Sequence, residues 1–290
     1  MAIHSKLVTI LGPTASGKTS MAIHLAQKYN GEIVCADSRT IYKGMDIGTA
    51  KPSIEEQRII KHHLLDICEP NKAFSSAEFK VLAQKTILDI QKRGKLPLLV
   101  GGSGMYIDSI LFDYKFRNDL SSTSIDKLSN YSIEKLQNIA MQKYPIQFNT
   151  IDIKNRRRLV QLIAKGPSKD DDRNSSKVDS LVLGIQPNKA QLKQNIELRT
   201  KSILNQNFIQ EVKVLRDKFG ETEVLKQTTG YSQVLDYLNG DIKNIDELYI
   251  VIVNATWQLS RKQMTWFKRN KNIQWVKTLP EMESLMKSYL

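Results

Sequence analysis

The chain has 290 residues, enough to bury a substantial core as one large domain or two smaller ones. Hydrophobic residues make up 41% and charged residues 25% of it, a balance that excludes a disordered or membrane-embedded protein. Lys and Arg number 43 against 30 Asp and Glu, so the formal net charge is +13. Such a surplus predicts a polyanionic partner, nucleic acid first, although an ordinary cationic surface would give the same count.

The cysteines and the apolar runs give no sign of export or of a membrane. Cys35 and Cys68 are the only cysteines and have no CxxC spacing, so we expect neither a disulfide framework nor a structural zinc site. The apolar run at 7–11 is too short for a signal-peptide core. No stretch reaches the roughly 18 apolar residues that span a bilayer. We therefore expect a cytoplasmic protein with no membrane partner.

The first hundred residues alternate short apolar runs with longer amphipathic ones, as strand and helix units of a parallel sheet do. Ser75 and Glu78 have the spacing of a capping box at the start of one predicted helix. The predicted fold class is therefore α/β. In chain order we expect a strand at 7–11, a helix at 17–29, strands at 32–36 and 64–68, a helix at 75–93 and a strand at 95–100.

The composition changes at about residue 113. Ser, Asn, Lys and Asp become frequent and helical periodicity is weak, which predicts a small helical insertion rather than more sheet. The polar stretch 167–177 is expected to be a loop. A strand at 180–185 and long helices from Lys189 onward follow. The expected organisation is a core domain formed by 1–112 and 178–290, with a helical insertion at 113–177.

The segment after the first predicted strand matches the phosphate-binding pattern G-x-x-x-x-G-K-[ST] at every fixed position, and a helix is predicted to follow it. In such a P-loop, backbone amides and the helix N-terminus surround a phosphate and Lys18 adds a positive charge. Thr19 would bind Mg²⁺. The residues expected to hold a diphosphate are Gly12, Thr14, Ala15, Ser16, Gly17, Lys18 and Thr19.

The acidic residue that P-loop NTPases place after a second strand is missing. The strand at 95–100 runs into a glycine-rich loop beginning at Gly101, and the next acid, Asp108, lies within the following predicted helix. Asp37 instead follows the strand at 32–36, at the sheet edge where the P-loop lies. Its position fits either a catalytic base or the cap of a turn.

The segment 255–277 is rich in basic residues, contains no acidic residue, and has aromatic residues interleaved. The aromatic side chains would suit stacking against bases or helix packing, and packing is their commoner use. The basic residues are Arg261, Lys262, Lys268, Arg269, Lys271 and Lys277, and the aromatic residues are Trp257, Trp266, Phe267 and Trp275.

Six further segments form a recognisable set. They are DSRTIY at 37–42, GMDIGTAKP at 44–52, LLDI at 64–67, the loop at Gly101, Gly230-Tyr231, and 258–267 with its Arg261-Lys262-Gln263 core. Together they closely resemble the tRNA dimethylallyltransferase family, also called tRNA isopentenyltransferases, in its bacterial form, and the resemblance spans nearly the whole chain. It implies a P-loop NTPase-like parallel sheet flanked by helices. It also implies transfer of a dimethylallyl group from dimethylallyl diphosphate to the exocyclic amine of the adenine 3′-adjacent to the tRNA anticodon, with release of pyrophosphate.

The resemblance also implies roles for single residues. Asp37 would take a proton or hydrogen bond from the amine, Lys18 and Mg²⁺ on Thr19 would stabilise the leaving diphosphate, and Thr14 and Ser103 would complete the catalytic set. The chain departs from the family pattern at Trp257, commonly Arg, and after Arg158. We expect a monomer. Contacts with the tRNA anticodon stem-loop are implied for Asp37, Ser38, Arg39, Thr40, Ser103, Asn155, Arg156, Arg157, Arg158, Arg261 and Lys262.

Three other functions share some of these features. An adenylate isopentenyltransferase of the cytokinin type would use the same P-loop and acid, but a mononucleotide does not require the basic tract at 255–277. A P-loop small-molecule kinase is opposed by the missing carboxylate after the strand at 95–100. An RNA-binding module with an unused P-loop would tolerate Lys18→Ala. His62 and His63 have no second ligand cluster nearby and receive no role.

Overall fold

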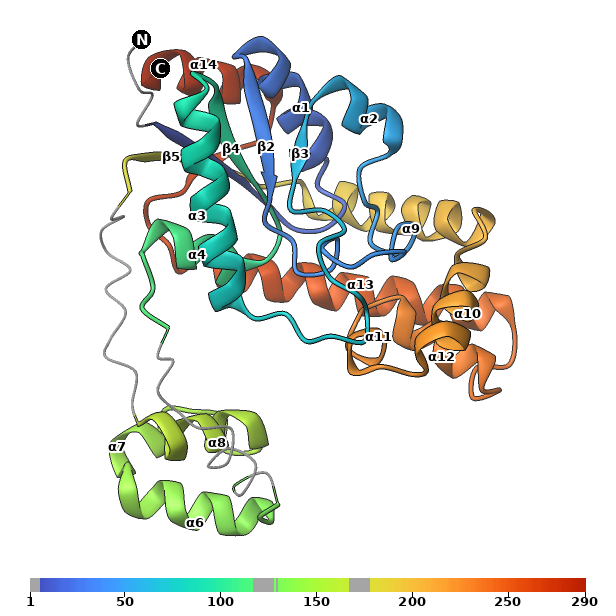
Figure 1. Cartoon of the computed structure of the whole chain (residues 1–290). Coiled ribbons are helices and arrows are strands. Elements are labelled where there is room, and N and C mark those ends of the chain that lie inside the picture. The colour runs from blue at the N-terminus through green and yellow to red at the C-terminus, as the bar shows by residue number, and fades with distance from the viewer. Residues whose placement is uncertain (1–5, 117–127, 129, 167–177) are drawn as a thin grey trace. The chain divides into compact units, whose positions relative to one another are not determined.

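The computed structural model describes residues 6–116, 128, 130–166 and 178–290, so the predicted loop at 167–177 lies outside the described residues. The chain divides into two compact units (Figure 1). The first consists of Met1–Asp113 with Arg173–Leu290, and the second of Tyr114–Asp172. None of the helices within the described ranges is long and apolar enough to cross a membrane.

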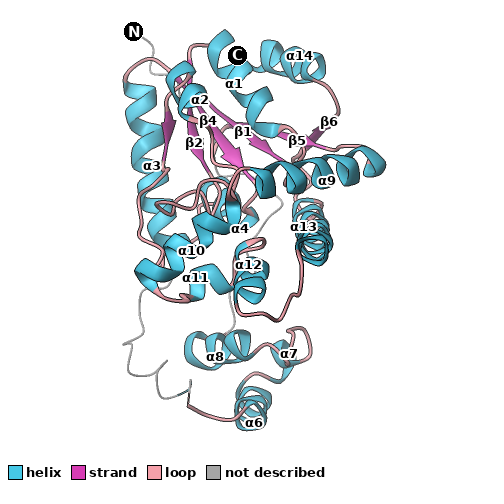
Figure 2. Cartoon of the chain, turned by 90° about the vertical axis from the view of Figure 1, so that its right-hand side faces the viewer, coloured by secondary structure: helices cyan, strands magenta, loops and turns pink. Residues whose placement is uncertain are grey.

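The first unit contains a six-stranded parallel sheet (Figure 2), which confirms the predicted α/β class. The strand order is β3-β2-β4-β1-β5-β6, so β4 lies between β2 and β1. Strands β1, β2 and β4 are buried along their whole length, and their sequences are accordingly almost continuously apolar. The strands are β1 Leu7–Leu11, β2 Gly31–Cys35, β3 His62–His63, β4 Leu96–Gly101, β5 Ser180–Ile185 and β6 Gln274–Val276.

Helices pack on both faces of this sheet. On one face, α1 and α14 share an apolar core with alternate strand residues. On the other face, α3 contacts β2 and β4 and packs beside α4, while α10, α12 and α13 enclose a second core with the segment that follows β2. The helices are α1 Lys18–Lys28, α2 Ile54–Ile59, α3 Ser76–Lys92, α4 Gly104–Leu111, α9 Lys189–Asn205, α10 Phe208–Phe219, α11 Glu223–Lys226, α12 Tyr231–Leu238, α13 Ile245–Phe267 and α14 Leu279–Tyr289.

Most predicted elements agree with the structure to within one residue, but the strand predicted at 64–68 is wrong. The strand is β3, two residues long at His62–His63, and it pairs with β2. Leu64 and Asp66 have φ angles of 64° and 54°, in the left-handed region, where a strand cannot continue. Leu65 nevertheless packs against the main core from this turn, which explains why the segment is apolar.

The second unit is a small helical cluster with its own apolar core. Its described helices are α6 (Ile133–Lys143), α7 (Pro145–Phe148) and α8 (Arg156–Lys165), and α6 and α8 contribute the buried side chains. Asn155 caps α8, because its side chain accepts a hydrogen bond from the Arg158 amide. The first turn of α8 contains no acidic residue.

A buried ionic network joins β2, β3 and the segment between α3 and β4. Both oxygens of the Glu32 carboxylate, which is 2% exposed, accept hydrogen bonds from Arg93, at 2.6 and 2.7 Å. Lys95 pairs with Oε1 at 2.8 Å, and His63 Nε2 lies 2.7 Å from Oε2. The bidentate Arg93 guanidinium, supported by Lys95 and His63, holds the pKa of Glu32 far below its usual range.

We expect Glu32→Gln to lower the free energy of unfolding at pH 7 by about 1–3 kcal/mol, because hydrogen bonds to a charged group are lost. Since folding lowers the pKa of Glu32, its contribution is complete above the unfolded pKa and declines as the pH falls below about 5. Urea unfolding from pH 7 to pH 4 should therefore show a shallower decline for the variant than for the wild type. Glu223→Gln, at an exposed position on α11, is the control and should match the wild type. Parallel pH curves for Glu32→Gln and wild type would contradict the assignment.

Candidate active site

The predicted P-loop connects β1 to α1 in a conformation suited to an anion. Ala15 and Gly17 have left-handed backbone, with φ of 63° and 82°. Gly17 is the N-cap of α1 and provides no side chain to cap the helix. The first amides of α1 therefore point at an open site, which is the usual arrangement for binding a phosphate.

Beside the P-loop is a cavity of about 280 Å³ that brings predicted residues from separate segments together. Its wall includes apolar residues of β2 and β4, namely Ile33, Cys35 and Val100. The cavity therefore has a charged part and a hydrocarbon part. The polar and charged residues at its wall include Thr14, Lys18, Thr19, Asp37, Thr40 and Arg199.

Lys18 and Arg199 give the cavity two mostly buried cations. Burial lowers the pKa of Lys18 to about 8, an effect that Asp37 opposes and Arg199 strengthens. Burial also lowers the pKa of Arg199, although a guanidinium remains charged at neutral pH. Arg199 Nη1 donates to Thr14 Oγ1 at 2.7 Å and Nη2 donates to the Gly48 carbonyl at 3.4 Å. Two cations beside one carboxylate favour an anionic ligand.

Arg199 was not predicted from the sequence, although a signal exists. It lies on the buried stripe of α9, at the helical spacing of the buried residues Leu192, Ile196 and Ile203. An arginine at a core position of an amphipathic helix must have an anionic or hydrogen-bonding partner, because an unpaired buried charge is costly. This reasoning would have pointed to an anion near α9.

Asp37 follows β2 and lines the cavity. Its Oδ1 accepts a hydrogen bond from the Arg39 amide at 2.8 Å, so it does cap a turn. Its Oδ2 has no hydrogen bond to any residue that the structure describes. One oxygen thus fixes the side chain and the other is available to a ligand, so the capping and catalytic interpretations are compatible.

Ser103 supports the Asp37 turn from the start of α4. Its hydroxyl accepts a hydrogen bond from the Ser38 amide at 2.8 Å and lies 3.1 Å from the Ser38 hydroxyl. Its own amide donates to the Ala36 carbonyl at 3.2 Å. The structure therefore places Ser103 against the residues on either side of Asp37.

The glycine-rich loop after β4 permits close packing. A Cβ atom on Gly101 would lie 1.9 Å from the Ala36 carbonyl oxygen, and one on Gly104 would lie 2.1 Å from the Trp266 ring. Any side chain at either position would push the end of β2 or α13 away. The loop therefore holds β2 and α13 close to β4.

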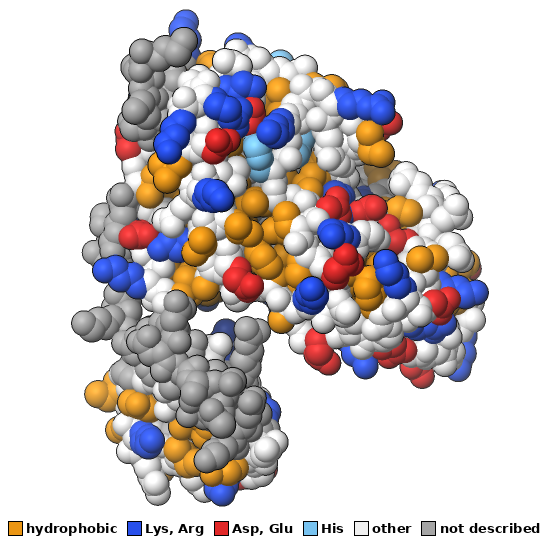
Figure 3. Space-filling model, viewed as in Figure 1, with side chains coloured by type: hydrophobic (Ala, Val, Ile, Leu, Met, Phe, Trp, Pro, Cys, Tyr) orange, Lys and Arg blue, Asp and Glu red, His pale blue; other side chains and the backbone are white. Residues whose placement is uncertain are grey.

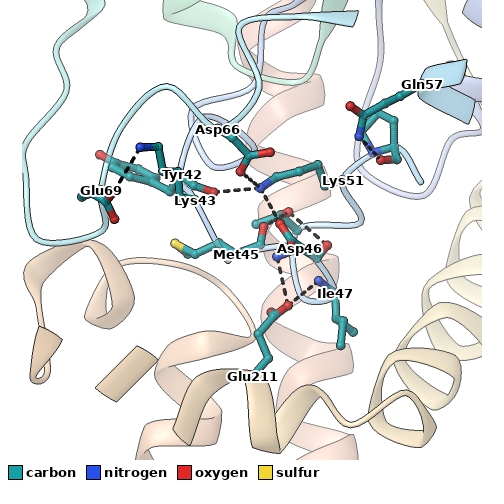
Figure 4. Close-up of polar contacts among 12 residues, drawn as sticks. Tyr42, Lys43, Met45, Asp46, Ile47, Lys51, Gln57, Asp66, Glu69 and Glu211 are labelled. Atoms are coloured by element: carbon teal, nitrogen blue, oxygen red, sulfur yellow. Dashed lines mark hydrogen bonds and ion pairs between the residues drawn. The ribbon is translucent and has the colours of Figure 1, made fainter. Parts of the chain in front are cut away.

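The segment at 44–52 is fixed by a buried ammonium group (Figure 4). The Lys51 side chain is 4% exposed and lies 2.5 Å from both Asp46 Oδ1 and Asp66 Oδ1. It also donates to the Tyr42 carbonyl at 2.8 Å. These contacts tie the segment to the turn that follows β3, and the residues just before Lys51, Thr49 and Ala50, line the cavity.

Glu211 of α10 fixes the same segment from the other side (Figure 4). Its carboxylate accepts hydrogen bonds from the amides of Asp46, Ile47 and Gly48 at 3.0, 2.7 and 3.3 Å. The Tyr231 hydroxyl donates to it at 2.5 Å. Because the Gly48 carbonyl accepts from Arg199, Glu211 also contributes indirectly to the position of that cation. Glu211 was not predicted from the sequence.

The remaining predicted RNA-contacting residues lie in both units. Arg39 donates to the Gln227 carbonyl at 3.3 Å, and Arg261 and Lys262 are exposed on α13. Asn155 and the following arginines begin α8 in the second unit, where Arg156 donates to the Tyr131 carbonyl.

Three aromatic residues of the 255–277 segment pack against other parts of the protein and do not extend into solvent. Trp257 belongs to an apolar cluster that includes Ala15 of the P-loop. Trp266 donates to Asp108 Oδ2 at 2.8 Å, and Phe267 is fully buried. The packing interpretation therefore holds for these residues. Trp257 supports the P-loop from α13.

The oxygen donors at the cavity suit a Mg²⁺ ion that is held partly by substrate oxygens. They are too few for a metal whose ligands all come from the protein. Within the described residues there is no group of three or more His, Cys, Asp or Glu side chains that could hold a metal. Thr19 contributes a hydroxyl and Asp37 a carboxylate to the same cavity. Mg²⁺ typically binds through few protein oxygens together with substrate phosphates and water, so these residues fit it.

Two hydroxyl groups at the site are buried and have no hydrogen-bond partner among the described residues. They belong to Ser16 in the P-loop and to Thr40, which also lines the cavity. Buried polar atoms nearly always have partners in native proteins. The buried Thr9 hydroxyl of β1, which does not line the cavity, likewise has no partner among these residues, so the three hydroxyls do not by themselves mark a ligand site.

Comparisons with known proteins found relatives that match most of the chain. A family model described as IPP transferase matches residues 40–270. The tRNA dimethylallyltransferase of Bifidobacterium longum subsp. infantis is 37% identical over 288 residues, covering 94% of this chain and 87% of that protein. The corresponding enzyme of Staphylococcus saprophyticus is 36% identical over 294 residues, covering 93% and 90%.

A solved structure extends the similarity to the fold. The tRNA isopentenylpyrophosphate transferase of Bacillus halodurans aligns with a TM-score of 0.76 and 29% identity, over 98% of this chain and 96% of that one. The chain belongs to the IPP transferase family, whose curated bacterial members are tRNA dimethylallyltransferases.

Proposed function

We propose that this chain transfers a dimethylallyl group from dimethylallyl diphosphate to the exocyclic amine of the adenine 3′-adjacent to the anticodon of a tRNA, releasing pyrophosphate. The observation that carries the proposal is that one cavity combines a phosphate cradle, an apolar wall and the Asp37 carboxylate. Family membership and the names of the bacterial relatives support tRNA as the acceptor.

The diphosphate binds at the charged part of the cavity. The α1 N-terminus and Lys18 contact its oxygens, and Arg199 provides a second cation. Thr19 would hold Mg²⁺ together with diphosphate oxygens, and the ion would supply Lewis-acid stabilisation of the leaving group. These groups stabilise the charge that grows on pyrophosphate as the allylic C–O bond breaks. The hydrocarbon chain lies against the wall that includes Ile33, Cys35 and Val100.

Asp37 orients the amine and receives its proton. The C–N bond forms as the C–O bond breaks, the bonding pair leaves with pyrophosphate, and the amine proton passes to the carboxylate. The turn that fixes Oδ1 leaves Oδ2 for this task. Positioning the amine and the allylic carbon together supplies much of the rate enhancement.

The adenine must leave the base stack of the anticodon loop to reach this cavity. Thr40 lines the cavity beside Asp37, and we assign it to the extruded nucleotide. Ser38 and Arg39 precede Thr40 on the same turn. Ser103, hydrogen-bonded to Ser38, holds this turn in place.

Each unit carries cations that we assign to the RNA backbone. The first turn of α8 contains Arg156, Arg157 and Arg158 without an acidic residue, an arrangement that opposes the helix dipole but attracts phosphate. On α13, Arg261 and Lys262 are exposed. Figure 3 shows one face of the molecule, on which basic and acidic side chains are interspersed. One chain supplies every group named here, as a monomer would.

A transfer assay separates this function from its rivals. Purified protein with Mg²⁺ and labelled dimethylallyl diphosphate is given unmodified tRNA, AMP or no acceptor. We expect label in tRNA alone. Label in AMP would indicate a cytokinin-type enzyme, and no label together with phosphate transfer from ATP would indicate a kinase.

Asp37→Asn should lower kcat by about a hundredfold or more, the usual effect of losing a positioned base. Asn keeps an oxygen for the Arg39 amide, so the turn and the affinity for tRNA should be preserved. Turnover and tRNA binding are measured on the same preparation. Asp217→Asn, exposed on α10, serves as the control. Unchanged turnover in Asp37→Asn would rule out the base.

Arg156→Ala and Arg158→Ala should each weaken tRNA binding and reduce the slope of log Kd against log salt by about one, because each removes a phosphate contact. The affinity for dimethylallyl diphosphate should stay the same. Binding is measured at several salt concentrations, with Lys287→Ala on α14 as a control that removes one exposed charge. If all three variants behave alike, the start of α8 is only a solvated face.

A further inference from the structure

Gln263 of α13 connects two loops of the active site. Its Oε1 accepts a hydrogen bond from the Thr14 amide of the P-loop at 2.9 Å. Its Nε2 donates to the carbonyl of Gly102, in the loop after β4, at 3.1 Å. A Cβ atom on residue 102 would lie 2.6 Å from that nitrogen, so the glycine makes room for the amide. The oxygen and the nitrogen of the Gln263 amide therefore each bind a different loop.

The loop after β4 continues this connection to Asp37. Ser103, next to Gly102, bonds to the Ala36 carbonyl through its amide and to the Ser38 amide through its hydroxyl. Asp37 lies between these two partners. Hydrogen bonds on either side of the Gly102–Ser103 peptide therefore link the P-loop, through Gln263, to the turn that carries the proposed base.

The sheet explains why such a connection is needed. The P-loop follows β1 and Asp37 follows β2, but β4 lies between these strands. The strands that precede the two loops therefore do not pair with each other. The distance between the P-loop and Asp37 depends on the hydrogen bonds that each loop makes with the loop after β4. In-line transfer requires the diphosphate and the base at a set separation, and an error of about 1 Å can cost a hundredfold in rate.

We infer that Gln263 is a positioning residue that sets the separation between the diphosphate cradle and Asp37. This inference rests on the proposed function. Gln263 does not touch the reacting atoms. It fixes the Pro13–Thr14 peptide by occupying the Thr14 amide, while Arg199 holds the Thr14 hydroxyl. It also holds the loop from which Ser103 supports Asp37.

The first test is pyrophosphate binding to Gln263→Met, which keeps the side-chain length but makes neither hydrogen bond. Because the cradle loses a fixed peptide, we expect pyrophosphate affinity, measured by calorimetry with Mg²⁺, to fall about tenfold. Gln206→Met, exposed at the end of α9, is the control and should bind like the wild type. This measurement needs no acceptor, so it remains informative if the transfer assay fails. Unchanged affinity in Gln263→Met would overturn the inference.

The second test is a double-mutant cycle between Gln263→Met and Ser103→Ala. If both residues act in series, breaking either connection already separates the cradle from Asp37, and the double variant should lose no more kcat than the worse single variant. Each single loss should be about tenfold to a hundredfold, with Kd for tRNA and Tm close to wild type. Losses that multiply, or that follow a lowered Tm in all variants, would show independent structural roles and overturn the inference. A wild type without transfer activity would instead overturn the proposed function.

Discussion

The active site depends on a P-loop backbone that cannot hold its shape alone. Ala15 is left-handed without being glycine, a conformation that persists only where surrounding contacts maintain it. Those contacts come from the far end of the sequence. Asn195 donates to the Ala15 carbonyl at 3.1 Å, Gln263 holds the Thr14 amide, and Trp257 packs in the same cluster as Ala15. The phosphate cradle is therefore complete only when α9 and α13 have packed against the sheet.

The same arrangement leaves the site with unbalanced charge. Burial lowers the pKa of both Lys18 and Arg199, and the carboxylate of Asp37 opposes this effect at each of them. Removing two cations from water is costly unless anions surround them. The lowered pKa of Lys18 is one sign of that cost. A bound diphosphate would offset this electrostatic cost with its negative charge. The same two buried cations therefore destabilise the empty site and favour binding of the diphosphate.

Features built from consecutive residues could be predicted from the sequence, whereas contacts between residues far apart in the chain could not. The P-loop and Asp37 could be predicted because strand, turn and helix are consecutive in the chain. The partners of Arg199 and Gln263 lie 185 and 249 residues away, so the sequence does not identify them, although the position of Arg199 on the buried stripe of α9 does indicate an anionic partner. The error at β3 has a similar cause: the apolar Leu65 reaches the core from a turn, and burial was mistaken for a strand. Apolar patterns indicate burial more reliably than they indicate backbone conformation.

Helix α13 carries both a residue that holds the P-loop and exposed basic residues. It is 23 residues long, so at about 1.5 Å per residue it extends over about 35 Å as a single rigid element. Gln263 points inward to the cradle, whereas the preceding Arg261 and Lys262 are exposed. The two exposed cations on the outer side and the side chain that holds the Thr14 amide on the inner side therefore lie within a single turn of the helix. Because α13 is one packed helix, the positions of these two cations are fixed relative to the P-loop that Gln263 holds.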